Sequence, residues 1–190
     1  MIDLLRNNIE DYVKITDEDF FAIRQHFDQM DFRKGDFIIR AQDSVSAIYF
    51  IQSGLVKLSY WGQDGKEHIA SFAMENWWET DFNAFYLQRK SSCTLQCLEA
   101  TTAYCLSLKN YQNLCARFPY MTGYFLDKSI RGHIANQNRI LSLLTLSPKQ
   151  KYEQFLQLYP SLVQRIPKTI LAAYLGLSRE TLSRLYRRKK

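Results

Sequence analysis

The sequence has no apolar run of about 18 residues, the length that a membrane-spanning helix needs. The first eight residues carry acidic and polar side chains where a signal peptide would be apolar. We therefore expect a cytoplasmic protein with no membrane partner.

Histidine and cysteine are both scarce: the histidines are His26, His68 and His133, and the cysteines are Cys93, Cys97, Cys105 and Cys115. No two of the cysteines have the Cys-x-x-Cys spacing of a metal or redox site. Metal-dependent enzymes built on small β-barrels need two or three histidines and a carboxylate around one metal. Only His68 falls in the strand-rich part of this sequence. We therefore expect neither an enzyme nor a bound metal, and we expect the thiols to stay reduced in a cytosol.

The 190 residues are long enough for one large or two small domains, and 46% of them are hydrophobic, as in a folded globular protein. The net charge is +6, but it is unevenly placed. Residues 161–190 hold eight Lys or Arg and one acid, which leaves the rest of the chain close to neutral. A basic surplus confined to one segment indicates a phosphate-rich partner such as double-stranded DNA.

Short β-forming runs separated by turn residues occupy the chain from Asp31 to about Leu108. Closely spaced short strands are typical of a sandwich or barrel, and here they predict a jelly-roll β-roll. A helix over about 17–29 is expected before them, because Phe20, Ile23 and Phe27 repeat at helical intervals. The expected strands cover 37–40, 47–51, 55–60, 68–72, 92–98 and 103–108.

Helix is expected again at about Leu108–Ala116 and, after Pro119, in a long stretch to about Thr145. Apolar residues in the long stretch recur at intervals of 4, 3, 4 and 3, which is a heptad seam suited to pairing with a second copy of the chain. The alternative is that this stripe packs on the β-roll. The seam consists of Ile130, Ile134, Gln137, Leu141 and Leu144. Ser147-Pro148 then predicts the start of a helix over Lys149–Tyr159.

The last part of the chain, from Lys168 to Arg187, predicts two short helices joined by a tight turn. Ala172 permits a close helix crossing, Gly176 supplies the turn, and Ser178 is a good N-cap. The second helix buries Leu182, Leu185 and Tyr186 and turns outward Arg179, Glu180, Ser183, Arg184, Arg187 and Arg188. This is the layout of a helix-turn-helix, although an ordinary helical hairpin with a charged face is the alternative.

The whole arrangement resembles the Crp/Fnr family of bacterial transcription regulators. Its strongest match is Gly176-Leu177-Ser178-Arg179-Glu180-Thr181-Leu182-Ser183-Arg184, which is similar to the recognition-helix signature of that family. Ile48-Tyr49-Phe50-Ile51-Gln52-Ser53-Gly54-Leu55-Val56-Lys57 and the turn at Asp64-Gly65-Lys66-Glu67 are similar to its roll.

The resemblance implies an α+β fold and a homodimer that binds a palindromic operator, with RNA polymerase as a further partner. We expect a β-roll sensor domain over 1–118, a dimerisation helix over 119–146 and a helix-turn-helix domain over 147–190. Because the sequence ends at Lys190, the wing of that domain is expected to be truncated or absent. A ligand-binding or protein-interaction module without sequence-specific DNA binding is the alternative function.

The resemblance also implies that Arg179, Glu180 and Arg184 read base edges, and the chemistry of these side chains agrees with that role. Thr169, Ser178, Arg187 and Arg188 are better placed to contact phosphates, which set register but carry no sequence information.

The phosphate-binding cassette of the family departs from its usual pattern in this chain. Aligning Thr80-Asp81 with the usual Gly-Glu places Ser91 where an arginine belongs, whereas aligning Glu79 restores Arg89 but places Trp78 at the glycine. Neither alignment gives a complete phosphate site, so we expect no cyclic nucleotide cofactor. Another small effector remains open, and the residues expected to line its pocket are Asp81, Arg89, Ser91, Ser92 and Gln137.

Overall fold

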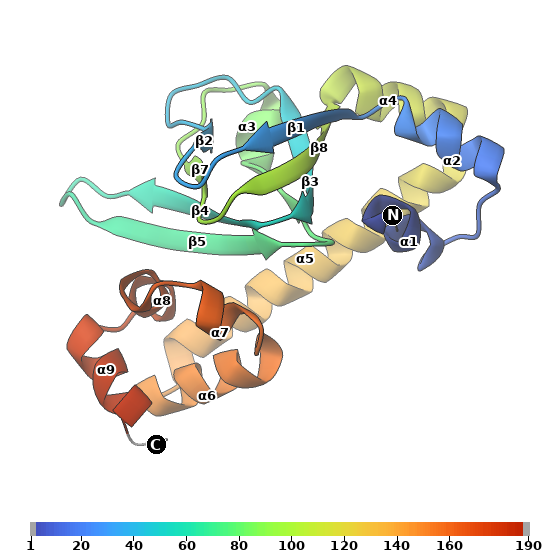
Figure 1. The fold of residues 1–190 in the computed structure, drawn as a ribbon. Helices are drawn as coiled ribbons and strands as arrows, with labels where there is room; N and C mark the ends of the chain where they lie inside the picture. Colours follow the sequence, from blue (N-terminus) through green and yellow to red (C-terminus); the bar gives the residue numbers. More distant parts are fainter. Residues whose placement is uncertain (1–2, 188–190) are drawn as a thin grey trace. The chain divides into compact units, whose positions relative to one another are not determined.

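The computed structural model describes residues 3–187, without the side chain of Arg187. The helices and strands form two compact units (Figure 1). The first unit comprises the chain up to Tyr60 together with Ala70–Lys128, and the second comprises Trp61–Ile69 together with the chain from Ser129 onward.

Within residues 3–187, the strands form two four-stranded sheets whose orders are β1-β8-β3-β6 and β2-β7-β4-β5. The strands of the first sheet are β1 (Asp28–Phe32), β3 (Ala47–Ser53), β6 (Trp78–Glu79) and β8 (Thr101–Ser107). Those of the second sheet are β2 (Phe37–Ile39), β4 (Leu55–Trp61), β5 (Glu67–Met74) and β7 (Thr94–Cys97). This mixed α+β architecture confirms the predicted β-roll.

The helices of the first part of the chain are α1 (Leu4–Glu10), α2 (Asp17–Arg24), α3 (Phe82–Leu87) and α4 (Leu108–Arg117). Those that follow are α5 (Pro119–Thr145), α6 (Pro148–Leu158), α7 (Leu162–Arg165), α8 (Lys168–Leu175) and α9 (Arg179–Arg187). No helix in the described part of the chain is both long and apolar enough to span a membrane.

The core of the first unit lies inside the roll and beneath the helices that flank it. Phe50, Ile51 and Leu106 are fully buried, because β3 and β8 run through the centre of their sheet. Tyr124 of α5 is buried among them and accepts a hydrogen bond from Trp78 Nε1 at 2.9 Å. Its hydroxyl donates to Asn8 Oδ1 at 2.6 Å, so a chain of hydrogen bonds holds α1 and β6 to the first turns of α5.

The predicted helix over 17–29 is wrong beyond Arg24. Helix α2 ends at Arg24, and β1 begins at Asp28 and pairs with β8 in antiparallel register, with Met30 opposite Ala103. The backbone of this segment therefore takes its hydrogen bonds from a neighbouring strand, which overrides the helical spacing of Phe27. Helices α1 and α3 and the short strand β6 are not expected from the sequence.

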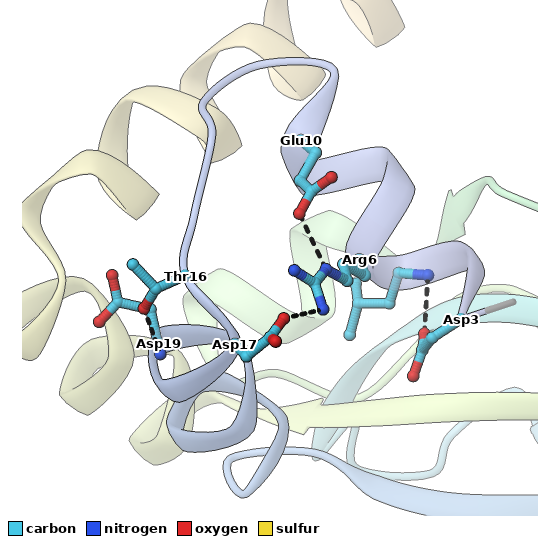
Figure 2. Close-up of polar contacts among 7 residues, drawn as sticks. Asp3, Arg6, Glu10, Thr16, Asp17 and Asp19 are labelled. Carbon is cyan, nitrogen blue, oxygen red and sulfur yellow. Dashed lines mark hydrogen bonds and ion pairs between the residues drawn. The ribbon is translucent and has the colours of Figure 1, made fainter.

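An ion-pair cluster joins α1 to α2 (Figure 2). Arg6 contacts Glu10 through Nε at 2.8 Å and Asp17 through Nη1 at 2.6 Å. The side chain of Thr16 caps α2 by accepting from the backbone of Asp19 at 3.1 Å. The ion pairs of Arg6 therefore hold α1 and α2 together ahead of β1.

Gly54 is the position at which the turn between β3 and β4 tolerates no side chain. Its φ is +102°, and a Cβ there would lie 2.5 Å from the carbonyl oxygen of Ala100. We expect Gly54→Ala to lower the free energy of unfolding by at least about 2 kcal/mol, because backbone atoms must move. Urea denaturation measures this effect.

Gly132→Ala is the matched control, because Gly132 lies in α5 and an added Cβ would meet no atom within 4 Å. There the same substitution should stabilise the protein slightly through helix propensity. Equal stability of Gly54→Ala and the parent protein would contradict this description of the turn.

Candidate nucleic-acid interface

The second unit is built around the apolar faces of α6, α8 and α9. Ser147 caps α6 by accepting from the backbone of Gln150, whose side chain returns a bond to the backbone of Ser147, so the two form a capping box. Pro148 is the first residue of the helix, as the sequence indicates. The side chains that meet in this core are Tyr152, Phe155, Leu162, Ile166, Leu171, Ala172, Leu175 and Leu182.

A left-handed glycine ends α8 and directs the chain into α9. Gly176 has φ 65° and ψ 34°, and its N–H donates to Ala173 O at 3.2 Å. The N–H of Leu177 donates to Ala172 O at 2.9 Å. These two bonds form a Schellman motif, which closes a helix within one residue and leaves a short turn. The predicted helix–turn–helix geometry is present.

Ser178 starts α9 as its N-cap. Its hydroxyl accepts from the backbone N–H of Thr181 at 3.1 Å, and its carbonyl accepts from Leu182 N at 3.1 Å. Leu182 is fully buried, while Leu185 and Tyr186 are partly buried, so the expected apolar stripe faces the unit's core.

The exposed face of α9 carries charge. Arg179, Glu180 and Arg184 are all exposed, whereas Ser183 is only partly exposed. Hydrogen bonds from its own backbone N–H and from Ser178, together with the positive charges of Arg179 and Arg184, lower the pKa of Glu180. The helix therefore offers guanidinium donors and an ionised carboxylate side by side.

Four residues are predicted to contact DNA phosphates, and the structure describes the side chains of two of them. Thr169 on α8 and Ser178 are exposed. Arg187 closes α9, but its side chain lies outside the described atoms, and Arg188 lies outside the described residues. The sequence did not single out Lys168, whose ammonium group stands 4.5 Å from the ring centroid of Tyr186. This cation–π contact places a further positive charge beside α9.

The heptad stripe of α5 is exposed along its length. Ile130 and Ile134 are each 50% exposed, Leu141 is 52% and Leu144 is 76%. Gln137 is also exposed. Leu126 and Ile140 belong to the same stripe by helical spacing and are exposed as well, although the sequence analysis missed them.

The residues predicted to line an effector pocket differ in their burial and in the unit to which they belong. Asp81 and Ser91 are buried and joined, because the Ser91 hydroxyl lies 2.8 Å from Asp81 Oδ2. Asp81 Oδ1 meanwhile caps α3 through the backbone of Ala84 at 3.1 Å. Arg89 and Ser92 are exposed, and Gln137 belongs to the second unit.

Glu79 adds a buried carboxyl group near Asp81, and its burial is not predicted from the sequence. Glu79 is 7% exposed, and its Oε atoms accept hydrogen bonds from Ser71 Oγ at 2.5 Å and from the backbone of Thr80 at 3.0 Å. Burial raises the pKa of Glu79 to about 7, and the nearby charge of Asp81 acts in the same direction. The interior of the roll at this point favours a neutral carboxylic acid.

This pKa predicts that the free energy of unfolding falls as pH rises. The folded state holds its Glu79 proton up to about pH 7, whereas the unfolded chain loses it near 4.5, so folded molecules bind more protons between these values. The contribution of Glu79 to the free energy of unfolding is fully present below about pH 4.5 and is lost as pH rises to about 7. The loss attributable to Glu79 is about 3 kcal/mol.

Urea denaturation from pH 5 to pH 8 measures the loss, and Glu79→Gln should remove most of its pH dependence. The same slope in Glu79→Gln and in the parent protein would assign the effect to other groups.

All four cysteines are free thiols. Burial raises the pKa of each of them, most strongly at Cys105, where it reaches about 12. No cluster of histidines, cysteines and carboxylates with the proximity of a metal site occurs among residues 3–187.

The comparisons with known proteins agree with this architecture. Residues 29–118 match the cyclic nucleotide-binding domain family. No curated protein matches the sequence.

Solved structures of similar fold include FixK2 from Bradyrhizobium japonicum, with a TM-score of 0.75 and 14% identity over 85% of this chain and 83% of that one. The c-di-GMP-responsive global regulator CLP from Xanthomonas campestris has a TM-score of 0.74 and 14% identity, and the alignment covers 91% of each chain. The catabolite activator protein of Thermus thermophilus has a TM-score of 0.56 and 21% identity over 93% of this chain and 84% of that one.

Proposed function

We propose that this chain, whose fold is that of the Crp/Fnr regulators, is a homodimeric transcription regulator that binds a palindromic operator. The observation that carries this proposal is the outward face of α9, where Arg179, Glu180 and Arg184 project from a helix capped by Ser178. Arginine can donate two hydrogen bonds to guanine, one to O6 and one to N7, and glutamate can accept a hydrogen bond from N4 of cytosine. A short, capped, cationic helix of this kind suits the major groove of DNA.

The exposed stripe on α5 supports pairing of two copies. Large apolar side chains at heptad spacing gain free energy when two copies of the helix bury them against each other. Left exposed, they form an apolar patch of the kind that marks an interaction surface. A two-fold dimer presents α9 twice, with half-site centres about 34 Å apart. The polar Gln137 within the stripe would set the register of the pair.

We propose that any effector of the β-roll is not a cyclic nucleotide. When Thr80-Asp81 is aligned with the usual Gly-Glu, Ser91 stands where the phosphate-binding arginine belongs. Ser91 is fully buried and lies within hydrogen-bonding distance of Asp81, whose carboxylate repels an anion. An effector would act by shifting the population of dimers whose two α9 helices match the operator. The proposed organisation remains a sensor over 1–118, a dimerisation helix over 119–146 and a DNA-binding part over 147–190, with RNA polymerase as a further partner.

Gel-shift titration of the purified protein against fragments of the genome that encodes it tests DNA binding directly. We expect a few fragments to bind at least about a thousandfold more tightly than random duplex DNA, with affinities that fall steeply as salt rises. Uniform weak binding to every fragment, or no binding, would favour a ligand-binding or protein-interaction module instead.

A further inference from the structure

A cavity of about 230 Å³ opens within the second unit, and the described residues that line it include none of α9 and none of the β-roll strands. Its walls come from the C-terminal half of α5, from α6 and from the end of α8. The residues that give it chemical character are Arg131, Arg139, Lys151, Phe155, Tyr159 and Tyr174. It combines a basic side with an aromatic side.

The charges around the cavity are of one sign. Arg131, Arg139 and Lys151 line it, and neither Asp nor Glu is among the described residues that do so. A concave lining that carries cations and no carboxylate favours an anionic ligand.

Arg139 is the most informative of these cations. It is only partly exposed, and its guanidinium carbon stands 3.7 Å from the ring centroid of Tyr174. Its Nη1 donates to Tyr174 O at 2.9 Å and its Nη2 donates to Ile69 O at 2.7 Å. Both acceptors are neutral carbonyls, so these bonds orient the side chain without neutralising its charge.

Burial lowers the pKa of Arg139, and the groups that raise it are Tyr174 and Tyr159, not carboxylates. A partly buried cation that faces no carboxylate in the described part of the chain is costly, and an arriving anion would offset that cost. Arginine has five N–H donors in a fork that matches a carboxylate, and two donations leave others for a ligand.

The other side of the cavity limits the size and kind of the ligand. The ring of Phe155 lies 5.4 Å from that of Tyr159 and 5.6 Å from that of Tyr174, centroid to centroid, so the rings form an aromatic cluster. A cavity of about 150 Å³ holds benzene, whereas drug-sized ligands need about 300 Å³ or more. A single ring with a short acidic arm fits between these limits.

We propose that this cavity is a binding site for a small aryl carboxylate, with the carboxylate at Arg139 and Lys151 and the ring against Phe155 and Tyr159. Ile134 belongs both to the cavity wall and to the exposed stripe of α5. A bound ligand therefore touches the helix that is proposed to pair two copies. That regulatory consequence rests on the proposed DNA-binding function, whereas the binding site itself does not.

Isothermal titration calorimetry of the full chain with 3-phenylpropionate tests the site in the absence of DNA. The neutral alcohol 3-phenylpropan-1-ol controls for the charge, and propionate controls for the ring. We expect 3-phenylpropionate to bind at least about tenfold more tightly than either control, because a charge-assisted hydrogen bond and ring burial each contribute that much.

Two variants locate the site. Arg139→Gln and Lys151→Gln should each weaken 3-phenylpropionate binding at least about fivefold. Lys149→Gln is the matched control on the same helix, because Lys149 pairs with Glu153 at 3.8 Å and does not line the cavity. It should leave affinity unchanged. Lys151→Gln removes no described hydrogen bond or ion pair, so it remains informative if Arg139→Gln fails to fold.

Equal binding of the acid and the alcohol, or unchanged binding in Lys151→Gln, would overturn the proposed site. Because these titrations contain no DNA, such a result would leave the gel-shift outcome standing, and a failed gel shift would leave the titration outcome standing.

Discussion

Leu141→Asp is expected to convert the protein to a monomer and to weaken its binding to a palindromic operator at least about a hundredfold. The substitution places two carboxylates in the proposed seam, where each would be buried beside apolar side chains of the other copy. Without pairing, each α9 binds its half-site alone, and the gain of about 10²–10⁴ from linking two binding elements is lost. Sedimentation velocity gives the oligomeric state and fluorescence anisotropy gives the affinity.

Leu87→Asp is the matched control for this variant. Leu87 is 54% exposed on α3, nearly the same as Leu141 at 52%, but it lies outside the heptad stripe. It should change neither mass nor affinity. If monomeric Leu141→Asp bound the operator as tightly as the parent protein, the dimeric mode of recognition would be wrong.

Arg184→Ala is expected to relax sequence discrimination about 5- to 150-fold while leaving binding to random DNA nearly unchanged. Arg184 is exposed on α9, one turn beyond Glu180, which places its guanidinium on the outward face. A bidentate contact to guanine is worth about 1–3 kcal/mol of discrimination, and alanine removes it entirely. Competition gel shifts with the operator and with single base-pair variants of it measure the ratio.

Arg188→Ala serves as the comparison, because a phosphate contact acts on all sequences alike. It should weaken operator and random DNA by the same factor and reduce the salt slope by about one. Equal losses on operator and random DNA for Arg184→Ala would assign that residue to the phosphate backbone instead.

The helix-turn-helix was predictable because every local signal agrees with the tertiary structure. Gly176 takes a left-handed conformation that few other residues adopt, and Ser178 caps α9 with its own side chain. The apolar stripe of α9 faces the core at the spacing that the sequence displays. The roll was predictable for a similar reason, since turn residues such as Gly54 separate its strands at positive φ.

Local sequence patterns do not predict the features that contacts between distant residues decide. Spacing alone extends the helix at 17–29 through Phe27, but pairing with β8 claims the chain from Asp28. Asp81 and Ser91 lie ten residues apart in the sequence, and only the fold brings them within hydrogen-bonding distance of each other. The cavity at Arg139 draws its walls from three helices, and its lining residues are spread from Arg131 to Leu175, so no short stretch of sequence reveals it.

Selection of bound duplexes from a random DNA library tests most directly whether the protein binds DNA as a two-fold dimer that uses α9 of both copies. We expect the enriched sequences to be inverted repeats whose half-site centres lie about 10–10.5 base pairs apart, with a conserved guanine in each half. Enrichment of isolated half-sites without a fixed spacing, or no enrichment at all, would contradict it.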